Sequence, residues 1–321
     1  MKRLKRLSMS GVLVLVITGV VLGMVIFTMV LFLNTYQQSL VRSAQTSSRQ
    51  AVEQVSNTVA GYVSDMDGLL TLVKDTLEET GRDDQLRREF FEDLLLIRTD
   101  VAAVTTYDST GNLLDCRTLE HEPRETIYEN LSFQGQWLSK YGEGYISQPH
   151  VESIFPGWYP WVVTMLEPLE RDGEEAWVAL DLRFASISSY INNVGIGQHG
   201  YCFLMDESGI LYHPQQQLIY SQLKSEDTDT LADLPDGTYS ESNVIYVLQT
   251  VEGSPWRVVG VSYVDELVTS SLWENFWLLA LAAVAALPPA LVGSLGISPP
   301  PARPPQALSP ALRQFGKNAR T

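Results

Sequence analysis

The sequence predicts an α+β fold in which a long N-terminal helix leads to two similar antiparallel-sheet modules in tandem, flanked by two transmembrane helices. Three observations support this prediction. Two long runs without charged residues lie near the two ends of the 321-residue chain, a heptad-like apolar stripe follows the first run, and a strand–turn–strand pattern occurs twice. A pattern that recurs in one chain indicates two copies of one structural unit.

Residues 11–33 are the first predicted transmembrane helix. At about 1.5 Å per residue, this uncharged run spans the roughly 30 Å hydrocarbon core of a bilayer. A cleaved signal peptide is the alternative, but the run is too long and no small-x-small cleavage site follows it. Residues 275–297 are the second predicted span, with Trp273 and Trp277 suited to the membrane interface. Its Pro288 and Pro289 predict a kink, since proline removes a backbone donor.

The cations outside the spans predict the orientation of the chain. Eight of them lie in the two tails, which contain no acid: Lys2, Arg3, Lys5, Arg6, Arg303, Arg313, Lys317 and Arg320. By the positive-inside rule both tails are cytoplasmic, including the basic tail at residues 1–10. Residues 34–274 are therefore expected outside a cell membrane that the chain crosses twice.

The external segment is strongly acidic. The whole chain has 38 Asp and Glu, 22 Lys and Arg and a net charge of −16, and without the eight cations of the tails only 14 of the 22 Lys and Arg remain against all 38 acids at residues 34–274. Such a segment repels nucleic acid and anionic lipid headgroups, so neither is expected as its partner. Membrane lipid is expected only around the spans. The acidity itself is also explained by solubility alone.

Residues 34–82 are predicted to form one long stalk helix. The residues Val52, Val55, Val59, Tyr62, Met66, Leu69 and Val73 recur in steps of three and four, which makes a heptad-like stripe. The stripe fits either a partner helix or a sheet of the same chain. Gly81 is the expected end of the helix, and Asp83 or Asp84 is the expected cap of a short helix that reaches Ile97.

Two hairpins define the predicted modules, residues 83–192 and residues 193–270. Asp108, Gly111 and Leu113 match Asp206, Gly209 and Leu211, with a strand on either side. Each module closes with a strand that begins at a tryptophan, Trp177 or Trp256. We interpret both aspartates as turn residues, because Asp accepts hydrogen bonds from backbone donors two residues on. The first module has a longer segment between its hairpins, which could cover a pocket.

The stretch GYCFLMDESGILYHPQQQLIYSQLKSE resembles the membrane-proximal module of double Cache domains, which are PAS-like extracellular sensors found on sensor histidine kinases of Gram-positive bacteria. VESIFPGWYPWVVTMLEPL and VALDLRFASISSYINNVGIGQHGY resemble the outer module and the bridge between the modules. The resemblance covers residues 35–270. RPPQALSPALRQFGK resembles the first helix of a HAMP linker, although SPPPARPP before it is unusually rich in proline. From this resemblance, residues 298–321 are expected to start a HAMP-like linker. Since no second HAMP helix follows in the sequence, a truncated or frameshifted product is expected.

The resemblance implies the sensory half of a two-component histidine kinase, which binds a small extracellular ligand and signals across the membrane. The same input could instead serve a chemoreceptor or a cyclic-dinucleotide enzyme. A membrane-anchored surface hydrolase or adhesion module is an alternative of another class. The chain contains no catalytic motif, no metal-ligand spacing and no cofactor motif, so kinase activity would require a further C-terminal part.

The predicted ligand site lies in the outer module. Trp158, Tyr159 and Trp161 supply flat apolar faces with polar tips, and Asp181 lies on the following strand, a combination that suits a small organic molecule. The alternative is that these aromatic residues only fill a core. Cache sensors of amino acids have an Arg-x-Trp-Tyr run, but here Pro156 stands in place of the arginine. Arg124 or Arg183 is the expected substitute, and Tyr107 completes the candidate set.

Three smaller expectations concern the cysteines, His213 and the oligomeric state. Cys116 and Cys202 are interpreted as buried small hydrophobic residues, with a disulfide as the alternative. His213 is interpreted as an end-of-strand residue rather than a ligand contact. Gly19 and Gly23 form a small-xxx-small pair in the first span, and together with the stalk stripe they predict a parallel homodimer.

Overall fold

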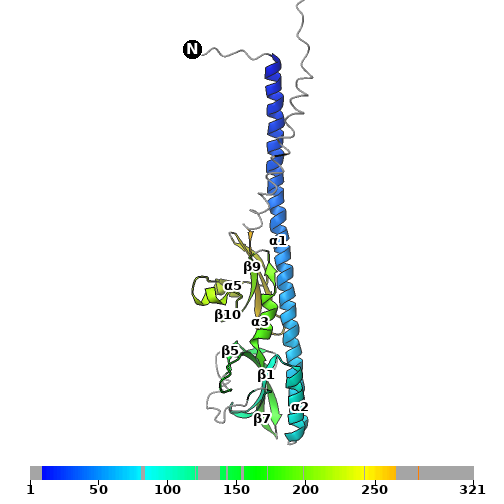
Figure 1. Cartoon of the computed structure of the whole chain (residues 1–321), viewed down its shortest axis with the longest axis vertical. Helices are drawn as coiled ribbons and strands as arrows, with labels where there is room; N and C mark the ends of the chain where they lie inside the picture. The colour runs from blue at the N-terminus through cyan, green and yellow to red at the C-terminus, as the bar shows by residue number, and fades with distance from the viewer. Residues whose placement is uncertain are drawn as a thin grey trace, which may run out of the picture. The chain divides into compact units, whose positions relative to one another are not determined.

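The computed structural model describes residues 9–80, 84–119, 121, 138–141, 144–152, 155–171, 173–197, 199–241, 243–264 and 281 (Figure 1). The chain forms two compact units, residues 1–39 with 268–321, and residues 40–267. Arg124, the predicted second span at 275–297 apart from Leu281, and the HAMP-like segment at 298–321 lie outside the described residues.

Helix α1 (Met9–Thr80) begins within the basic tail and continues through the predicted first span and stalk. Its apolar side chains in the span are largely exposed, for example Val20, Met24 and Phe27. By length and composition α1 could cross a membrane, and it is the one helix among the described residues that meets this test.

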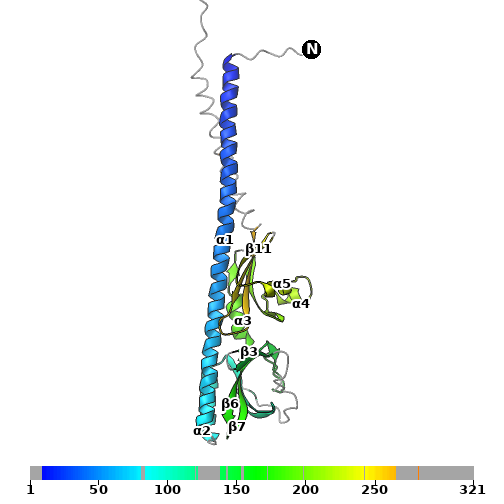
Figure 2. The same cartoon turned by 180° about the vertical axis from the view of Figure 1, so that it is seen from behind.

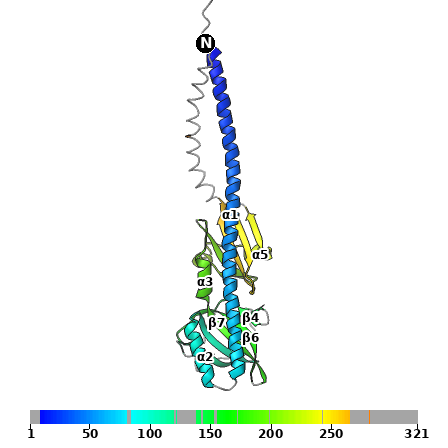
Figure 3. The same cartoon turned by 90° about the vertical axis from the view of Figure 1, so that its right-hand side faces the viewer.

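The second half of α1 packs against two sheets of its own chain, as Figures 1 and 3 show. Val52, Val55, Val59, Met66 and Val73 from the predicted stripe are almost completely buried in a core that includes residues of both sheets. Further along the helix the buried positions move by one residue, since Val63, Leu70 and Leu77 are buried while Tyr62 and Leu69 are only partly so. A straight helix with 3.6 residues per turn drifts relative to a seven-residue repeat, which explains this displacement. Of the two interpretations of the stripe, packing on the same chain is what the structure shows.

Helix α2 (Asp84–Ile97) follows α1, as the sequence predicts, and leads into the first sheet. This sheet has the strand order β2-β1-β7-β6-β4-β3, with β5 paired to β6. The bounds of its strands are β1 Val101–Asp108, β2 Leu113–Arg117, β3 Leu138–Tyr141, β4 Gly144–Ser147, β5 His150–Val151, β6 Trp161–Arg171 and β7 Glu174–Arg183. All of its described pairings are antiparallel.

Helix α3 (Phe184–Asn192) follows the first sheet and leads to the second (Figure 2). The second sheet has the order β10-β9-β13-β12-β11, with β8 paired to β9. The spatial order β10-β9-β13-β12 corresponds to the order β2-β1-β7-β6 of the first sheet. Its elements are β8 Gly195–Ile196, β9 Gly200–Asp206, β10 Gly209–Tyr212, α4 Gln216–Tyr220, α5 Thr228–Asp233, β11 Gly237–Glu241, β12 Val244–Thr250 and β13 Arg257–Tyr263. Ile187 and Ile191 of α3 are buried in the core shared with α1.

The two repeated aspartates shape turns, as the sequence predicts. Asp108 Oδ1 accepts hydrogen bonds from the Thr110 and Asn112 amides at 2.9 and 2.8 Å. Asp206 Oδ1 accepts one from the Ser208 amide at 2.8 Å. Gly111 and Gly209 follow with φ values of 88° and 131°, a backbone conformation that glycine adopts without strain.

Both cysteines are free thiols, so no disulfide joins them. Cys202 on β9 is completely buried in the core shared with α1, whereas Cys116 on β2 is partly exposed. Burial raises the pKa of the Cys202 thiol to about 12. Cys202 therefore acts as the buried small hydrophobic residue that the sequence predicts, whereas Cys116 departs from this prediction because it is only partly buried.

Gly260 on β13 allows α1 to approach the second sheet closely, because a Cβ at this position would overlap Val52 of α1 and crowd Ile196 of β8. We expect Gly260→Ala to lower the free energy of unfolding by about 1–3 kcal/mol, the usual cost of overpacking a core. Gly61→Ala is the matched control on α1, since a Cβ there meets nothing within 4 Å. This control should stabilise the helix by roughly 0.5–1 kcal/mol. Chemical denaturation of the full chain in detergent micelles measures both, and equal effects of the two substitutions would contradict the packing argument.

Candidate functional site

Three strands at the centre of the first sheet position the acidic candidate. Asp181 on β7 is paired with Thr164 on β6 and with Ala103 on β1. Residues paired across antiparallel strands point to the same face, so these three share one face. Leu180 and Leu182 alternate with Asp181 along β7 and belong to the core shared with α1. Asp181 therefore lies on the face directed away from α1.

Asp181 is almost completely buried, with 1% of its surface exposed. Its Oδ1 accepts a hydrogen bond from the Thr164 hydroxyl at 2.6 Å, while its Oδ2 is buried without a hydrogen-bond partner among the described residues. Burial and the nearby Glu152 charge raise the pKa of Asp181 to about 8, although the bond from Thr164 opposes this rise. A buried oxygen without a partner costs about 1–3 kcal/mol, so a donor from outside the chain would be bound favourably.

A second acid and a histidine lie beside Asp181. Glu152, just after β5, is 4% exposed, and its Oε2 is 3.9 Å from His150 Nε2. His150 Nε2 is also 3.5 Å from the Thr164 hydroxyl, and His150 Nδ1 is 3.0 Å from the Gln148 carbonyl. Since a carbonyl only accepts, Nδ1 is the protonated nitrogen of a neutral His150.

Aromatic side chains cover the same face. Phe155 is completely buried and packs with Ala103, the β1 partner of Asp181, in a small cluster that also includes Trp158. The Trp158 ring stacks on His121 with centroids 4.3 Å apart and contacts Phe155 at 5.0 Å. The guanidinium carbon of Arg183 is 5.1 Å from the centroid of the Trp158 ring, a favourable cation–π distance.

The loop that holds these rings is fixed at its base and at its turn. The Glu152 amide donates to the Pro160 carbonyl at 2.9 Å, which closes the segment between β5 and β6. Gly157 lies within it at a φ of 79°, where a side chain would be strained. The sequence PGW therefore turns the chain so that Trp158 reaches the sheet.

The remaining predicted site residues are distributed unevenly. Tyr107 lies on β1 four residues after Ala103, the partner of Asp181, and so points to the same face. It is 3% exposed, and burial together with the Asp181 charge raises its pKa well above the ordinary value. Tyr159 and Trp161 are 54% and 51% exposed, so more than half of the accessible surface of each residue faces solvent. The structure brings Trp158, Asp181, Arg183 and Tyr107 to one face, and Arg124 lies outside the described residues.

Sequence reasoning missed four residues of this site. Glu152, His150 and Phe155 precede the PGWYPW run, and His121 comes from a distant segment. The available signal was a single acid within the otherwise uncharged stretch HVESIFPGWYPW, since an isolated charge among apolar residues is often buried with a partner. His121 had no comparable signal, because its contact with Trp158 depends on the tertiary fold.

His213 belongs to a separate buried cluster of the second sheet. Its side chain is 1% exposed and its Nε2 is 3.4 Å from Oε1 of the buried Glu226. The Tyr201 hydroxyl donates to the same oxygen at 2.6 Å, and Lys224 Nζ lies 3.7 Å from it. His213 Nδ1 accepts a hydrogen bond from the Gln215 amide, so the proton of a neutral ring is on Nε2, facing Glu226. The interpretation of His213 as only an end-of-strand residue therefore missed this polar role.

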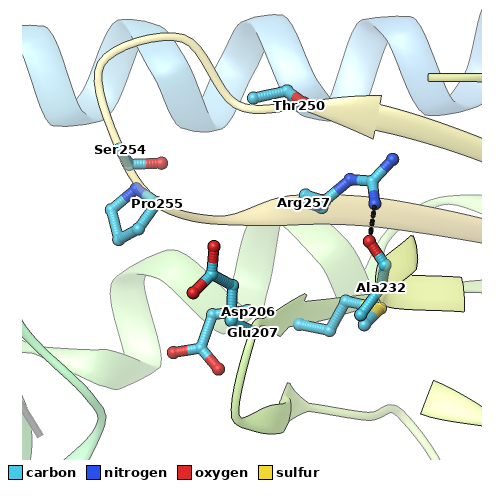
Figure 4. Close-up of a pocket in the computed structure, with 8 residues that line it drawn as sticks. Asp206, Glu207, Ala232, Thr250, Ser254, Pro255 and Arg257 are labelled. Carbon is cyan, nitrogen blue, oxygen red and sulfur yellow. Dashed lines mark hydrogen bonds between the residues drawn. The ribbon is translucent and has the colours of Figure 1, made fainter. Parts of the chain in front are cut away.

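A small cavity of about 160 Å³ lies at the turn of the β9–β10 hairpin (Figure 4). Asp206, Glu207, Thr250, Ser254 and Arg257 are among the residues that line it. The Arg257 guanidinium is already engaged, because it donates to the carbonyls of Leu231, Ala232 and Leu234 and to Asp236. This arginine fixes the segment around α5 to β13, which is a structural role.

Comparisons with known proteins agree with this architecture. The model of the Cache domain family matches residues 34–271. The sensory domain of the Campylobacter jejuni chemoreceptor Tlp3 with isoleucine bound has a TM-score of 0.53 and 11% identity, covering 73% of this chain and 97% of that one. The ligand-binding domain of the Pseudomonas fluorescens chemoreceptor CtaA in complex with L-leucine has a TM-score of 0.52 and 15% identity, covering 72% and 99%.

A third similar structure is the ligand-binding domain of the Pseudomonas aeruginosa PAO1 chemoreceptor PctB in complex with L-Arg, with a TM-score of 0.50 and 19% identity over 69% of this chain and 96% of that one. At these identities the solved structures show a shared fold. No curated protein sequence matches the chain. The family match includes most of α1 and both sheets, and it places this chain among the Cache domain proteins, a family of extracellular ligand-binding sensors.

Proposed function

We propose that the chain is the input half of a transmembrane receptor in which two tandem PAS-like modules lie between two membrane spans. A small extracellular ligand binds the first module on the face of the sheet that holds Asp181. The observation that supports this proposal is a buried carboxyl oxygen of Asp181 without a partner among the described residues, on the face covered by Phe155 and Trp158. A ligand donor would satisfy this oxygen.

The charges of the site favour a ligand with both an amine and a carboxylate. Asp181 and Arg183 are two residues apart on β7 and so point to one face. A ligand cation would displace the proton that burial holds on Asp181 and pair with the resulting carboxylate and with Glu152, while Arg183 beside Trp158 would face a carboxylate. Arg183 would then replace the arginine whose usual position is taken by Pro156. Solved structures of similar fold hold isoleucine, L-leucine and L-Arg, so amino acids are the first class to test.

The output that we propose is a two-component histidine kinase, reached through residues 275–297 as the second span and 298–321 as a HAMP-like segment. A chemoreceptor is the second candidate, because the solved structures of similar fold belong to chemoreceptors. Both candidates use the same input. The coding sequence downstream of residue 321 decides between them, since a kinase requires a phosphoacceptor histidine and an ATP-binding domain there.

A thermal-shift screen of the full chain in nanodiscs against amino acids and simple amines tests the ligand site. With any compound that raises the melting temperature, Asp181→Asn and Arg183→Gln should each abolish the shift while the protein remains folded. Asp181→Asn removes an ionisable carboxyl group but almost no volume, which makes it a cleaner probe than Trp158→Ala. Glu226→Gln is the matched control, a buried acid of the second sheet. Loss of the shift in Glu226→Gln, with an unchanged shift in Asp181→Asn, would refute the proposed location.

The proposed topology predicts that reporter fusions at residue 150 are active only outside the cytoplasm and fusions at residue 321 only inside it. The reason is the distribution of cations in the two tails. Activity of both fusions on the same side of the membrane would rule out two spans.

We also propose a parallel homodimer whose first spans meet at Gly19 and Gly23. In α1 a Cβ at either position meets nothing within 4 Å, which leaves this surface open to close approach by a second helix. Cysteine crosslinking along residues 8–20 in membranes should show helical periodicity, and a uniform profile would contradict the dimer.

A further inference from the structure

Gln148 bridges the two sheets. It lies between β4 and β5 of the first sheet, and its Nε2 donates to Asp206 Oδ2 at 3.1 Å and also contacts the Ser208 hydroxyl. Asp206 and Ser208 belong to the turn of the β9–β10 hairpin in the second sheet, where Asp206 Oδ1 accepts from the Ser208 amide. A single side chain of the first sheet thus engages the residues that shape a turn of the second.

The backbone of Gln148 is connected to the candidate site by further hydrogen bonds. The Ser147 hydroxyl donates to the Gln148 carbonyl at 2.9 Å and accepts from the Thr164 amide at 2.8 Å. The Thr164 hydroxyl donates to Asp181 Oδ1 at 2.6 Å. His150 Nδ1 is also within 3.0 Å of the Gln148 carbonyl. A series of hydrogen bonds, joined through the covalent structure of Thr164 and of Gln148, therefore runs from Asp181 to Asp206.

The Asp181 end of this series is shielded from water, whereas Gln148 is half-buried and Ser208 is exposed. Ser147 and Asp181 are each 1% exposed, Thr164 is 5% exposed and Asp206 is 5% exposed. Water cannot readily replace a hydrogen bond that breaks at such positions, so a change at one end is relieved by rearrangement of the next group. The Gln148–Asp206 hydrogen bond is the link between the two sheets that such a rearrangement would reach.

We propose that Gln148 is the positioning residue that couples the Asp181 site of the first sheet to the β9–β10 turn of the second. This inference rests on the proposed function in one respect, that Asp181 is where the ligand acts. A ligand ammonium or the loss of a proton at Asp181 changes the acceptor that Thr164 faces, and Ser147 and Gln148 transmit this change to Asp206. The effect continues along β9, which ends at Asp206, and reaches the neighbouring strand β13. The pairs between these two strands extend from Met205 with Arg257 to Tyr201 with Val261.

The experiment uses protons as the probe, because they change the charge of Asp181 without an identified ligand. Amide hydrogen exchange of the full chain in nanodiscs is measured at pH 6.5 and 9.5, and each rate is divided by the intrinsic rate at that pH. The readout is the protection of the amides at residues 207–210. Other titratable groups around Asp181 are Tyr107, Cys116, His150 and Glu152, with Arg183 as a fixed charge, so Asp181→Asn is needed to isolate its contribution.

In the parent chain we expect the protection of the turn to differ at least about 5-fold between the two pH values, the lower end of typical coupling between sites. The difference should fall below about 2-fold in Asp181→Asn and in Gln148→Leu. Gln217→Leu on the exposed side of α4 is the matched control and should keep the parent response. Gln148→Glu, which has nearly the same shape without the Nε2 donor, replaces the leucine variant if that variant does not fold.

Three results would overturn the coupling: no pH difference at the turn of the parent chain, the parent difference retained in the Gln148 variant that folds, or the parent difference retained in Asp181→Asn. In the last case another group would be the source. The outcome is independent of the ligand screen. A chain that binds none of the screened compounds but shows the expected pattern would reject the proposed ligand class while supporting the role of Gln148.

Discussion

Replacing Glu226 by alanine should lower the free energy of unfolding of the second sheet by about 3–5 kcal/mol, the usual cost of removing one partner of a buried ionic cluster. Glu226 accepts from the Tyr201 hydroxyl and faces His213 Nε2, and its own side chain is 4% exposed. Burial raises the pKa of Glu226, but its contacts with His213, Tyr201 and Lys224 more than offset this, so its pKa is lowered overall. The carboxylate is therefore ionised at neutral pH, and alanine leaves the buried Tyr201 hydroxyl without an acceptor and the buried His213 Nε2 without its charged neighbour.

The size of this effect distinguishes a cluster from an ordinary surface charge. Glu226→Gln keeps an acceptor oxygen at similar volume, so it should cost less than the alanine variant. Glu252→Ala, an exposed acid between β12 and β13, is the matched control and should change stability by less than about 0.5 kcal/mol. Hydrogen exchange of the slowest amides of β9 and β13 in the full chain measures each value. Equal stabilities of Glu226→Ala and Glu252→Ala would show that the cluster does not hold the second sheet.

The parts of the fold that depend on local patterns could be predicted from the sequence. The apolar stripe from Val52 to Val73 predicted a helix with one buried side, because side chains three and four residues apart share a face. Asp108 and Asp206, each followed by a glycine, predicted two turns, because the side chain and the glycine fix the backbone within a few residues. The matching strand order of the two sheets follows the same repeat.

Contacts between distant segments could not be predicted in this way. Glu226 is 13 residues from His213 in the irregular region around α4, and no periodicity indicates that the chain returns there. His121 reaches Trp158, and Gln148 reaches Asp206, only because the sheets place their loops together. The place of Asp181 after the aromatic run indicates a candidate in the sequence, but its unpaired oxygen and its neighbour Glu152 depend on the strand register.

Asp181 should make the parent chain progressively less stable than Asp181→Asn as the pH rises from about 4 to 8. Its pKa is about 8 in the folded chain, mainly because of burial and then Glu152, against about 3.9 when unfolded. Between these values the folded chain holds a proton that the unfolded chain has released. The slope of the unfolding free energy with pH is proportional to the protons bound in the unfolded state minus those bound in the folded state. It is therefore negative, and at most about 1.4 kcal/mol per pH unit is lost.

Chemical denaturation of both chains in detergent micelles at pH 4, 5, 6, 7 and 8 measures the difference, and the comparison removes groups that titrate equally in both. Asp236→Asn provides a control of opposite sign. Burial raises the pKa of Asp236, but bonds from the Thr250 amide and Arg257 lower it overall, so that acid stabilises the fold above its unfolded pKa and loses this effect as the pH falls. The free energy of unfolding of the parent should thus increase relative to that of Asp236→Asn as the pH rises through the acidic range. A parent chain that keeps a constant difference from Asp181→Asn from pH 4 to 8 would show that Asp181 titrates alike in the folded and unfolded states. Its carboxyl would then not be held in the buried, unpaired state on which the proposed ligand site depends.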